Sequence, residues 1–422
     1  MIQTYEELQD FFSSRRQLGI QLGLERLYYL LDKVRHPEKE LPVVHIAGTN
    51  GKGSTLTFIR QALIDSGYRV GSFVSPGLPT ILDHIYFNDE RIALDEFLQL
   101  LNEMMPVIHE MDQKEINPTE YEILMAITLL YFKNRVDIAL IETAMGGLED
   151  ITNCVQPIIT MITNVSNDHI GFLGPTLANI AEHKAGIIKD QIPVVLGEMD
   201  EEVLPILEQA ANEMNAPIYQ YGKDFHVESI RDEIDKQVFL WETANQQVEV
   251  AITMLGKHQI HNASCAMMAC HLLVKQGYSI DENRIREGFR QATISNRMEK
   301  ISENPVIYVD GAHNEAGIRA FSDTVAHYYS PEEVVIIVGV FKDKDVSSMI
   351  RILNEKYHTI YAMEFEHPRA MKKIDYEKLM DQPRLIENPS ALKRFINNEY
   401  KHLFFVGSLH FVSYIKQLIR NI

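Results

Sequence analysis

A glycine-rich stretch that carries one lysine is the clearest sign of chemistry in this chain. Residues 44–55 read VHIAGTNGKGST, an apolar run followed by Gly48, Gly51, Lys52 and Gly53. Glycines let the backbone approach an anion closely, and the amides that open the following helix can face phosphate oxygens. A lysine adds a positive charge to the same phosphates. The stretch therefore predicts a phosphate-binding loop, although Gly53 stands where the GxxxxGK[ST] spacing places a magnesium-binding hydroxyl.

A metal ion beside such a loop would need ligands from elsewhere, and polar residues follow three other apolar runs. They are Ser75 in SFVSPG, Glu142 in IALIETAMGG and His169 in TNVSNDHIGF. Glu142 is expected to be buried, where an unpaired carboxylate is costly, so metal ligation and an ordinary salt bridge are both open. Ser75 and His169 read more simply as turn or loop residues, and magnesium prefers oxygen ligands. Composition alone makes Lys184, in EHKAGIIK, a solvated helix lysine.

The elements that must position these residues alternate along the first half of the chain. Apolar, β-branched runs predict strands at 42–48, 69–76, 136–147, 157–166 and 192–198. Apolar residues three and four apart predict helices between them, for example at 94–111 and 119–134. Strands that alternate with helices imply an α/β fold with a parallel sheet and helices on both faces. Ligands of such sheets bind beyond the carboxyl ends of the strands, where the candidate residues follow their runs.

The pattern changes twice further along the chain. Shorter and more polar alternation at about 222–256 predicts a small antiparallel piece, and helical patterns follow at 261–277 and 281–292. The stretch 292–305 shows neither period and is predicted to be a connector. After it, strands and helices alternate again to the end of the chain.

Two domains are expected, because 422 residues exceed what one hydrophobic core usually supports. We place the boundary near residue 296, which gives a domain with the phosphate-binding loop at 1–295 and a second α/β domain at 296–422.

Composition excludes several classes of partner. Forty basic and 59 acidic residues give a formal charge of −19, which argues against a general binder of nucleic acid or anionic membrane. No apolar stretch approaches the roughly 18 to 20 residues that a membrane span needs, and the first residues do not read as a signal peptide. Cys154, Cys265 and Cys270 lack disulfide or metal-ligand spacing and are expected to be reduced thiols. We therefore expect a cytoplasmic protein, and nothing in the sequence demands more than a monomer.

Taken together, these motifs resemble the folylpolyglutamate synthase and dihydrofolate synthase family, which belongs to the wider Mur ligase group. The resemblance rests on GTNGKGST, IETAMGG, the Asp-His pair at 168–169, EHKAGIIK, RMEKI at 297–301 and DGAHNEAG at 310–317. LGLERLYYLLDKV near the start and VGSLHFVSYIKQLI near the end look similar too, so the resemblance spans nearly the whole chain. It implies a Mur-ligase-like ATPase domain with a phosphate loop, a parallel sheet and a small antiparallel piece, followed by a Rossmann-like domain.

The resemblance also implies where ATP and metal ions bind. The positions implied for ATP are Thr49, Asn50, Gly51, Lys52, Gly53, Ser54, Asn262, Arg297 and Asp310. The positions implied for Mg²⁺ are Ser75, Glu142, His169 and Lys184, the last as a carbamate formed with carbon dioxide, and a monovalent cation is a further candidate. Lys52, Lys184 and His313 are implied as catalytic residues.

Contacts with the pterin or folate substrate follow from the resemblance with less detail. The implied positions are Gly23, Leu24, Glu25, Arg26, Thr119, Glu120, Tyr121, Glu149, Asp150 and Ser408. Among the positions that depart from the family pattern, Leu148 replaces an arginine, and Gly77 replaces an aromatic residue or histidine. These departures remove a cation and a ring near the acceptor, so we expect an effect on affinity or substrate choice.

The activity implied is ATP-dependent addition of L-glutamate to dihydropteroate, to reduced folates or to both, through an acyl phosphate. Such a transfer depends mainly on alignment and charge neutralisation. We expect both activities, with folate extension alone as the second interpretation. A catalytically weakened paralogue that binds nucleotide or folate is an alternative of another class, and a ligase acting on a peptidoglycan precursor is a third.

Overall fold

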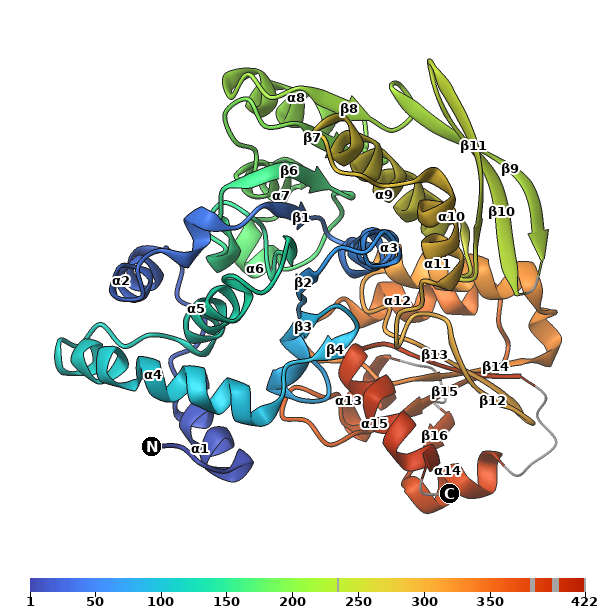
Figure 1. Ribbon diagram of the computed structural model, residues 1–422. Coiled ribbons are helices and arrows are strands. Elements are labelled where there is room, and N and C mark those ends of the chain that lie inside the picture. The colour runs from blue at the N-terminus through green and yellow to red at the C-terminus, as the bar shows by residue number, and fades with distance from the viewer. Residues whose placement is uncertain (234, 380–383, 397–401, 421–422) are drawn as a thin grey trace. The chain divides into compact units, whose positions relative to one another are not determined.

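The computed structural model describes the whole chain except residues 234, 380–383, 397–401 and 421–422 (Figure 1). The chain divides into two compact units. The first comprises Met1–Glu228, Phe239–Ala251 and His261–Ala292, and the second comprises Ser229–Val238, Ile252–Ile260 and Thr293–Ile422. The boundary near residue 296 stays a prediction, and the second unit also takes two short segments that precede it.

The first unit is built on an eight-stranded sheet of order β4-β3-β2-β5-β1-β6-β7-β8. Its strands are β1 Val43–Ala47, β2 Val70–Phe73, β3 Ile85–Phe87, β4 Glu90–Arg91, β5 Ile138–Glu142, β6 Pro157–Ile162, β7 Val194–Leu196 and β8 Ile218–Gln220. The six strands from β2 to β8 in this order are parallel, whereas β3 and β4 are antiparallel additions at one edge. The predicted α/β class and the five predicted strands are confirmed. The predicted parallel sheet carries two antiparallel strands, β3 and β4, at this edge, and these strands are too short to show a period in the sequence.

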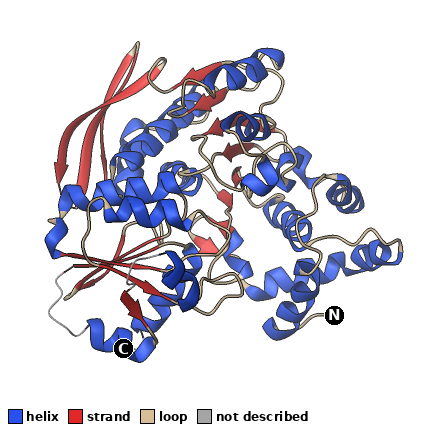
Figure 2. Cartoon of the chain, turned by 180° about the vertical axis from the view of Figure 1, so that it is seen from behind, coloured by secondary structure: helices blue, strands red, loops and turns tan. Residues whose placement is uncertain are grey.

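Helices cover both faces of this sheet (Figures 1 and 2). They are α1 Tyr5–Arg16, α2 Glu25–Lys33, α3 Lys52–Asp65, α4 Leu94–Gln113, α5 Glu120–Phe132, α6 Ile170–Leu173, α7 Leu177–Ala185, α8 Leu204–Glu213, α9 Lys257–Lys275 and α10 Glu282–Gln291, with 3-10 helices η1 Pro37–Glu40, η2 Ile81–His84 and η3 Ile151–Cys154. Val43, Ala139 and Ile141 share one apolar core with α1, α2, α4 and α5. Alternate strand residues face the other way, where α3 packs on α10 through Phe58 and Phe289, with ring centroids 5.0 Å apart.

A separate three-stranded sheet of order β11-β10-β9 forms from β9 Phe225–Glu233, β10 Lys236–Thr243 and β11 Gln246–Ile252. Two-residue connections can join only antiparallel neighbours, so this sheet is the predicted antiparallel piece.

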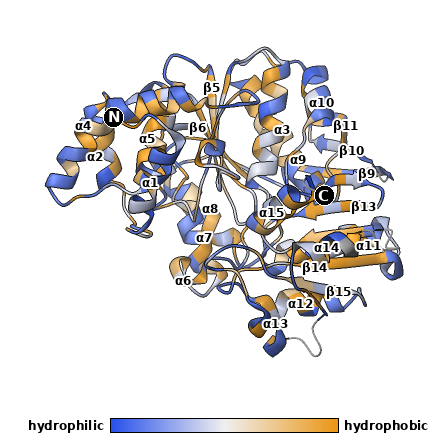
Figure 3. Ribbon diagram, turned by 90° about the horizontal axis from the view of Figure 1, so that it is seen from below, coloured by the Kyte–Doolittle hydropathy of each residue, from blue (hydrophilic) through white to orange (hydrophobic). Residues whose placement is uncertain are grey.

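The second unit contains a six-stranded sheet of order β12-β13-β17-β14-β15-β16. Its strands are β12 Glu299–Glu303, β13 Val306–Asp310, β14 Val334–Val338, β15 Ile360–Met363, β16 Arg384–Ile386 and β17 His402–Val406; its helices are α11 Glu315–Tyr328, η4 Pro331–Glu333, α12 Val346–Asn354, α13 Lys373–Leu379, α14 Pro389–Ile396 and α15 Leu409–Arg420. All neighbours are parallel except β12 and β13. Alternate residues of β14 and β17 enter two different apolar cores, and β14 is hydrophobic along its length (Figure 3).

Two expectations for this part of the chain need comment. The stretch 292–305 is not only a connector, because it contains strand β12. That strand is polar and its register shifts between Lys300 and Ser302, so no regular alternation marks it in the sequence. In the part where strands and helices are expected to alternate again, the segment 389–400 is a helix, α14, as far as Ile396, and its remaining residues lie outside the described part of the chain.

Two further expectations concern the whole chain. Cys154, Cys265 and Cys270 are buried free thiols, as expected. Within the described residues, no helix combines the length and the apolar character that crossing a membrane would require.

Candidate active site

The glycine-rich loop takes its shape from the segment that follows strand β6. The Thr49 amide donates to the carbonyl of Asn164 over 3.1 Å, and the Asn50 amide donates to Asn164 Oδ1 over 3.0 Å. Thr163 Oγ1 donates to the carbonyl of Asn50 over 2.6 Å. A Cβ atom on Gly48 would lie 1.9 Å from that hydroxyl, so only glycine fits there. Thr163 and Asn164 thus hold the loop, a role that their place after an apolar run could have suggested.

Lys52 begins helix α3 and folds back over the loop. Its Nζ donates to the carbonyl of Gly48 over 3.0 Å, and lies 3.8 Å from Oε1 of Glu142 at the end of strand β5. Asn262 on α9 packs against the same loop, because a Cβ atom on Gly51 would lie 2.2 Å from its Oδ1. Three of the predicted residues, one on each of α3, β5 and α9, therefore meet around one glycine-rich turn.

Glu142 is buried, with 5% of its surface exposed. Lys52 accounts for the salt bridge that was one of the two interpretations of this carboxylate. Metal ligation, the other interpretation, stays a prediction.

Lys184 corrects the expectation of a solvated side chain. It lies near the end of helix α7 and is only 2% exposed, because the helix buries this face against the sheet. Burial, followed by the positive charge of Lys52, lowers the pKa of Lys184 to about 7, while Asp168 and Asp150 act in the opposite direction. This lysine therefore lies within electrostatic reach of the phosphate loop and of two carboxylates.

Ser75 and Tyr121 connect the second strand to this region. Ser75 Oγ and the Tyr121 hydroxyl are 3.3 Å apart. Burial raises the pKa of Tyr121, the Ser75 hydrogen bond opposes this, and Glu120, Asp150 and Glu142 add to the rise. Ser75 therefore contacts a tyrosine whose pKa is raised in part by the Glu142 carboxylate.

His169 differs from the other predicted metal ligands in its setting. Its backbone has a positive φ of 51°, its side chain is exposed, and its Nε2 lies 4.0 Å from Oδ2 of Asp168. The part of the chain that the structure describes holds no group of three or more His, Cys, Asp or Glu side chains suited to a metal ion. Of the four residues predicted to bind Mg²⁺, only Glu142 and His169 are of these types; the other two are Ser75 and Lys184.

The two acidic residues that follow Gly147 and Leu148 differ in burial: Glu149 is half-buried and Asp150 is buried. Asp150 accepts from the amides of Met145 and Thr152 over 2.7 and 3.0 Å and from Thr152 Oγ1 over 2.6 Å, although burial raises its pKa. Glu149 is half-buried, with its Oε2 3.9 Å from Nδ1 of His183. Leu148 beside it is 51% exposed. Asp150 therefore has a structural role in this turn, whereas Leu148 and Glu149 present side chains to solvent.

The LGLER segment at 22–26 and the TEYE segment at 119–122 meet through a partly buried ion pair that sequence reasoning missed. Arg26 Nε donates to Oε1 of Glu122 over 2.8 Å, and the other oxygen of Glu122 accepts from the amide and hydroxyl of Thr119. Thr119 and Glu122 form the capping box that begins helix α5. Glu120 pairs instead with Arg16, at 2.6 Å. The S/T-x-x-E spacing was a signal for Glu122. Gly23, with a positive φ of 97°, and Leu24, which precedes α2, complete the turn.

Replacing Glu122 with alanine is expected to lower the free energy of unfolding by about 3 kcal/mol, because it leaves the Arg26 guanidinium without its partner and removes the cap. Urea denaturation followed by circular dichroism would measure this. Glu96→Ala, which breaks the more exposed pair with Arg135, is the control and is expected to cost much less. Equal losses in the two variants would contradict the structural role of Glu122.

In the second unit, three predicted residues gather at the carboxyl end of strand β13. The buried Asp310 accepts from the amides of Met298 and Ala312, both over 2.8 Å. Burial raises the pKa of Asp310, and Arg297 acts against this rise. His313 Nδ1 lies 2.8 Å from the carbonyl of Gly311, consistent with donation to it. Arg297, Asp310 and His313 thus form one polar group.

Ser408 has a local explanation. It is buried before α15, and its Oγ accepts from the amide of Phe411 over 3.0 Å, which satisfies a helix-start donor. A substrate role for Ser408 stays a prediction.

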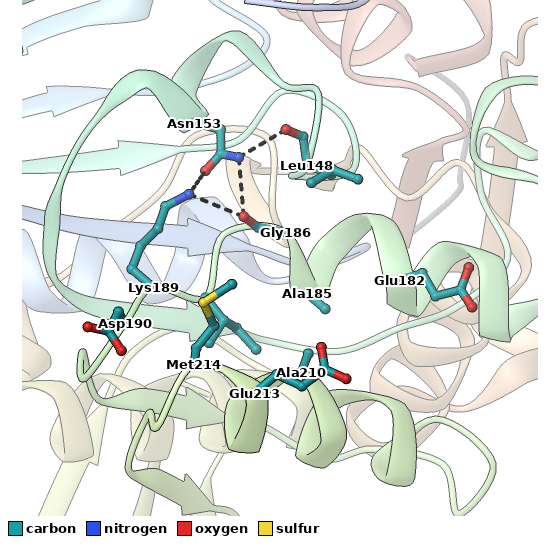
Figure 4. A pocket seen from close by; sticks show the side chains of 11 residues that line it. Leu148, Asn153, Glu182, Ala185, Gly186, Lys189, Asp190, Ala210, Glu213 and Met214 are labelled. Atoms are coloured by element: carbon teal, nitrogen blue, oxygen red, sulfur yellow. Dashed lines mark hydrogen bonds between the residues drawn. The ribbon is translucent and has the colours of Figure 1, made fainter.

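A cavity of about 400 Å³ lies beside α7 and α8, and its lining includes no residue of the phosphate loop (Figure 4). Lys189 lies at one side of it and donates to Asn153 Oδ1 over 2.7 Å. Leu148 and Met214 supply apolar lining. None of the residues that line this cavity belongs to the predicted ATP or metal set, so its size does not identify it as the site of chemistry.

Comparisons with known proteins agree with the resemblance. The model of the Mur ligase middle domain matches residues 46–270, and that of the Mur ligase glutamate ligase domain matches residues 296–399. The dihydrofolate synthase/folylpolyglutamate synthase of Bacillus subtilis (strain 168) is 33% identical over 431 residues, which cover 100% of each chain. The crystal structure of folylpolyglutamate synthase from Thermotoga maritima is 30% identical, with a TM-score of 0.86 over 99% of this chain and 96% of that one. A structure described as an FPGS-AMPPCP-folate complex is 27% identical, with a TM-score of 0.88 over 99% of this chain and 100% of that one.

Proposed function

This chain belongs to the Mur ligase family and, within it, to the folylpolyglutamate and dihydrofolate synthases, and from that premise we propose that it adds L-glutamate both to dihydropteroate and to reduced folates. The protein is an ATP-dependent ligase. The observation that carries the proposal of two acceptors is the end-to-end similarity to a relative that is named for both activities. The meeting of Lys52, Glu142 and Asn262 around the glycine-rich turn supports it.

The nucleotide would bind where the loop amides and the start of α3 face its phosphates. Lys52 would then exchange its contact with the Gly48 carbonyl for the phosphate oxygens. Thr49, Asn50, Gly51, Gly53, Ser54 and Asn262 are the proposed neighbours in the first unit, and Arg297, Asp310 and His313 are those in the second.

The residues proposed for Mg²⁺ are Ser75, Glu142, His169 and Lys184. The oxygens of Ser75 and Glu142 fit this ion, which prefers oxygen ligands. Beside Glu142, the buried Thr143 Oγ1 has no hydrogen-bond partner among the residues that the structure describes, so this strand end contains an unused polar atom. Bound Mg²⁺ supplies charge neutralisation for the phosphates. A monovalent cation is a further proposal, which a potassium titration of activity would test.

Lys184 is suited to carbamate formation by its surroundings. Only the neutral amine can attack carbon dioxide, and a pKa of about 7 makes that form abundant near neutral pH. The product is an anion, so it would replace the repulsion between Lys184 and Lys52 with attraction.

In the reaction, an oxygen of the acceptor carboxylate attacks the γ-phosphorus of ATP and ADP leaves, which gives an acyl phosphate. The α-amine of L-glutamate then attacks the acyl carbon, an amide bond forms, and phosphate leaves. Lys52 and the loop amides would hold the phosphates in line and oppose their charge, which is the main requirement of such transfers. No side-chain nucleophile is needed.

A panel of acceptors tests the proposal. The purified protein would be incubated with ATP, Mg²⁺ and labelled L-glutamate, with either dihydropteroate or tetrahydrofolate. Label is expected in both products. Extension of tetrahydrofolate alone would favour the single activity, and the absence of glutamate-dependent phosphate release with every acceptor would favour a binding paralogue. Gel filtration tests the further proposal of a monomer, and cell fractionation tests a cytoplasmic location.

A further inference from the structure

The turn that carries Ser75 is held on both sides by one imidazole ring. His84, the last residue of η2, places Nδ1 2.7 Å from the carbonyl of Val74, and its Nε2 accepts from the amide of Gly77 over 3.1 Å. Its own carbonyl accepts from the Val74 amide over 3.0 Å. Ser75 therefore lies inside a four-residue turn whose two ends are both bound to His84.

The same ring occupies the space that a side chain at position 77 would need. A Cβ atom on Gly77 would lie 2.4 Å from Cδ2 and 2.6 Å from Cγ of His84. The family pattern has a ring at position 77, where this chain has a glycine. In this chain, the ring of His84 fills the space beside that glycine instead.

The His84 ring also contacts the tyrosine that touches Ser75. It stacks on Phe73, with centroids 5.6 Å apart and planes 20° apart, and meets Tyr121 edge-on at 5.5 Å and 78°. The Tyr121 hydroxyl in turn lies 3.3 Å from Ser75 Oγ. One ring therefore fixes both the backbone that carries the serine and the side chain beside its hydroxyl.

The hydrogen bonds define the form of the imidazole. The Val74 carbonyl can only accept, so Nδ1 carries the proton, and the Gly77 amide can only donate, so Nε2 carries a lone pair. His84 is 4% exposed, and burial keeps its pKa low, at about 4. A neutral ring with one donor and one acceptor satisfies both ends of the turn, which neither an apolar ring nor a charged one can do.

We propose that His84 is a positioning residue for metal binding: by clasping the Val74 carbonyl and the Gly77 amide and packing against Tyr121, it presents the Ser75 hydroxyl to Mg²⁺. The inference rests on the proposed role of Ser75 as a ligand. Residues behind a metal ligand orient it, and their loss typically weakens metal binding about 10-fold to 100-fold.

The test is the Mg²⁺ concentration that gives half-maximal glutamate addition. His84→Phe, which keeps an apolar ring and loses both hydrogen bonds, is expected to raise it at least about tenfold. His84→Gln, which keeps a donor and an acceptor, is expected to stay closer to the wild type. A purely space-filling role predicts the reverse order, so that order would overturn the proposal. His109→Phe, at an exposed site on α4, is the control and is expected to change nothing.

Ser75→Ala separates this inference from the function on which it depends. If His84 acts through Ser75, His84→Phe adds little to the effect of Ser75→Ala in the double variant. Independent, multiplying effects would overturn the positioning role alone. A normal Mg²⁺ requirement in Ser75→Ala would overturn the ligand role and the inference together. Thermal unfolding checks that each variant folds, and ¹⁵N spectra of the histidine rings are expected to show a protonated Nδ1 in His84. If His84→Phe fails to fold, His84→Gln and Ser75→Ala with their double variant give the same decision.

Discussion

Lys52→Ala is expected to lower kcat/KM for ATP-dependent glutamate addition by at least about a hundredfold, because removing a charge aimed at transferring phosphates typically costs that much. The lysine is placed for this task by the Gly48 carbonyl and by Glu142, 3.8 Å from its Nζ. Steady-state rates with varied ATP would measure the effect. Lys223→Ala, at an exposed turn, is the control and is expected to leave the rates unchanged. A Lys52 variant with near-normal kcat/KM would remove the phosphate loop from the mechanism.

Lys184→Ala is expected to lose most of its turnover, at least about a hundredfold in kcat, while it still folds. Loss of the carbamate would remove an anionic group from the proposed metal site, and a short carboxylate such as acetate or formate is expected to restore part of the rate. Turnover with and without added carboxylate is the measurement. Near-normal activity of the variant would exclude the carbamate.

The burial of Lys184 also predicts how the free energy of unfolding changes with pH, and in which direction. In the unmodified form of the protein, the pKa of the Lys184 amine falls to about 7 on folding, below the ordinary value of a lysine near 10.4. Between these two values the unfolded chain binds more protons, so this group makes folding more favourable as the pH rises. Lys184→Met is therefore expected to be more stable than the wild type, with the largest difference below about pH 7 and a shrinking one toward pH 10. Denaturant midpoints at several pH values would show the trend.

The parts of the site that sequence reasoning predicted are those set by local chain geometry. The order of strand, glycines, lysine and helix predicted that Lys52 lies where a helix begins, and it does lie at the start of α3, because these segments are adjacent in the chain. Its role toward ATP stays a prediction. The end of the apolar run at 138–142 likewise indicated that Glu142 would be buried at a strand end. Ligands of parallel sheets bind beyond the carboxyl ends of the strands, so the sequence predicts that these side chains lie close together even though it shows no contacts.

The parts that it could not predict depend on contacts between distant segments. Lys184 reads as a surface lysine in its own helix, and only the packing of α7 buries it. Glu122 carries no sign of an ion pair in its own segment, because its partner Arg26 lies 96 positions away. His84 carries no local sign of its role, since the space that it fills becomes visible only when Gly77 is placed beside it. Strand β12 was not predicted for a different reason. It is a polar edge strand with a shifted register, so its sequence shows no regular alternation of apolar and polar residues.

The bracing of the glycine-rich turn by Thr163 and Asn164 has a consequence for protein engineering. The residues that shape the turn lie 113 and 114 positions further along the chain, on a neighbouring strand end. If residues 44–55 alone were grafted into another protein, the graft would contain the anion-binding sequence but not Thr163 and Asn164, which fix the shape of the loop. A working chimaera would need both segments, joined through the paired strands β1 and β6.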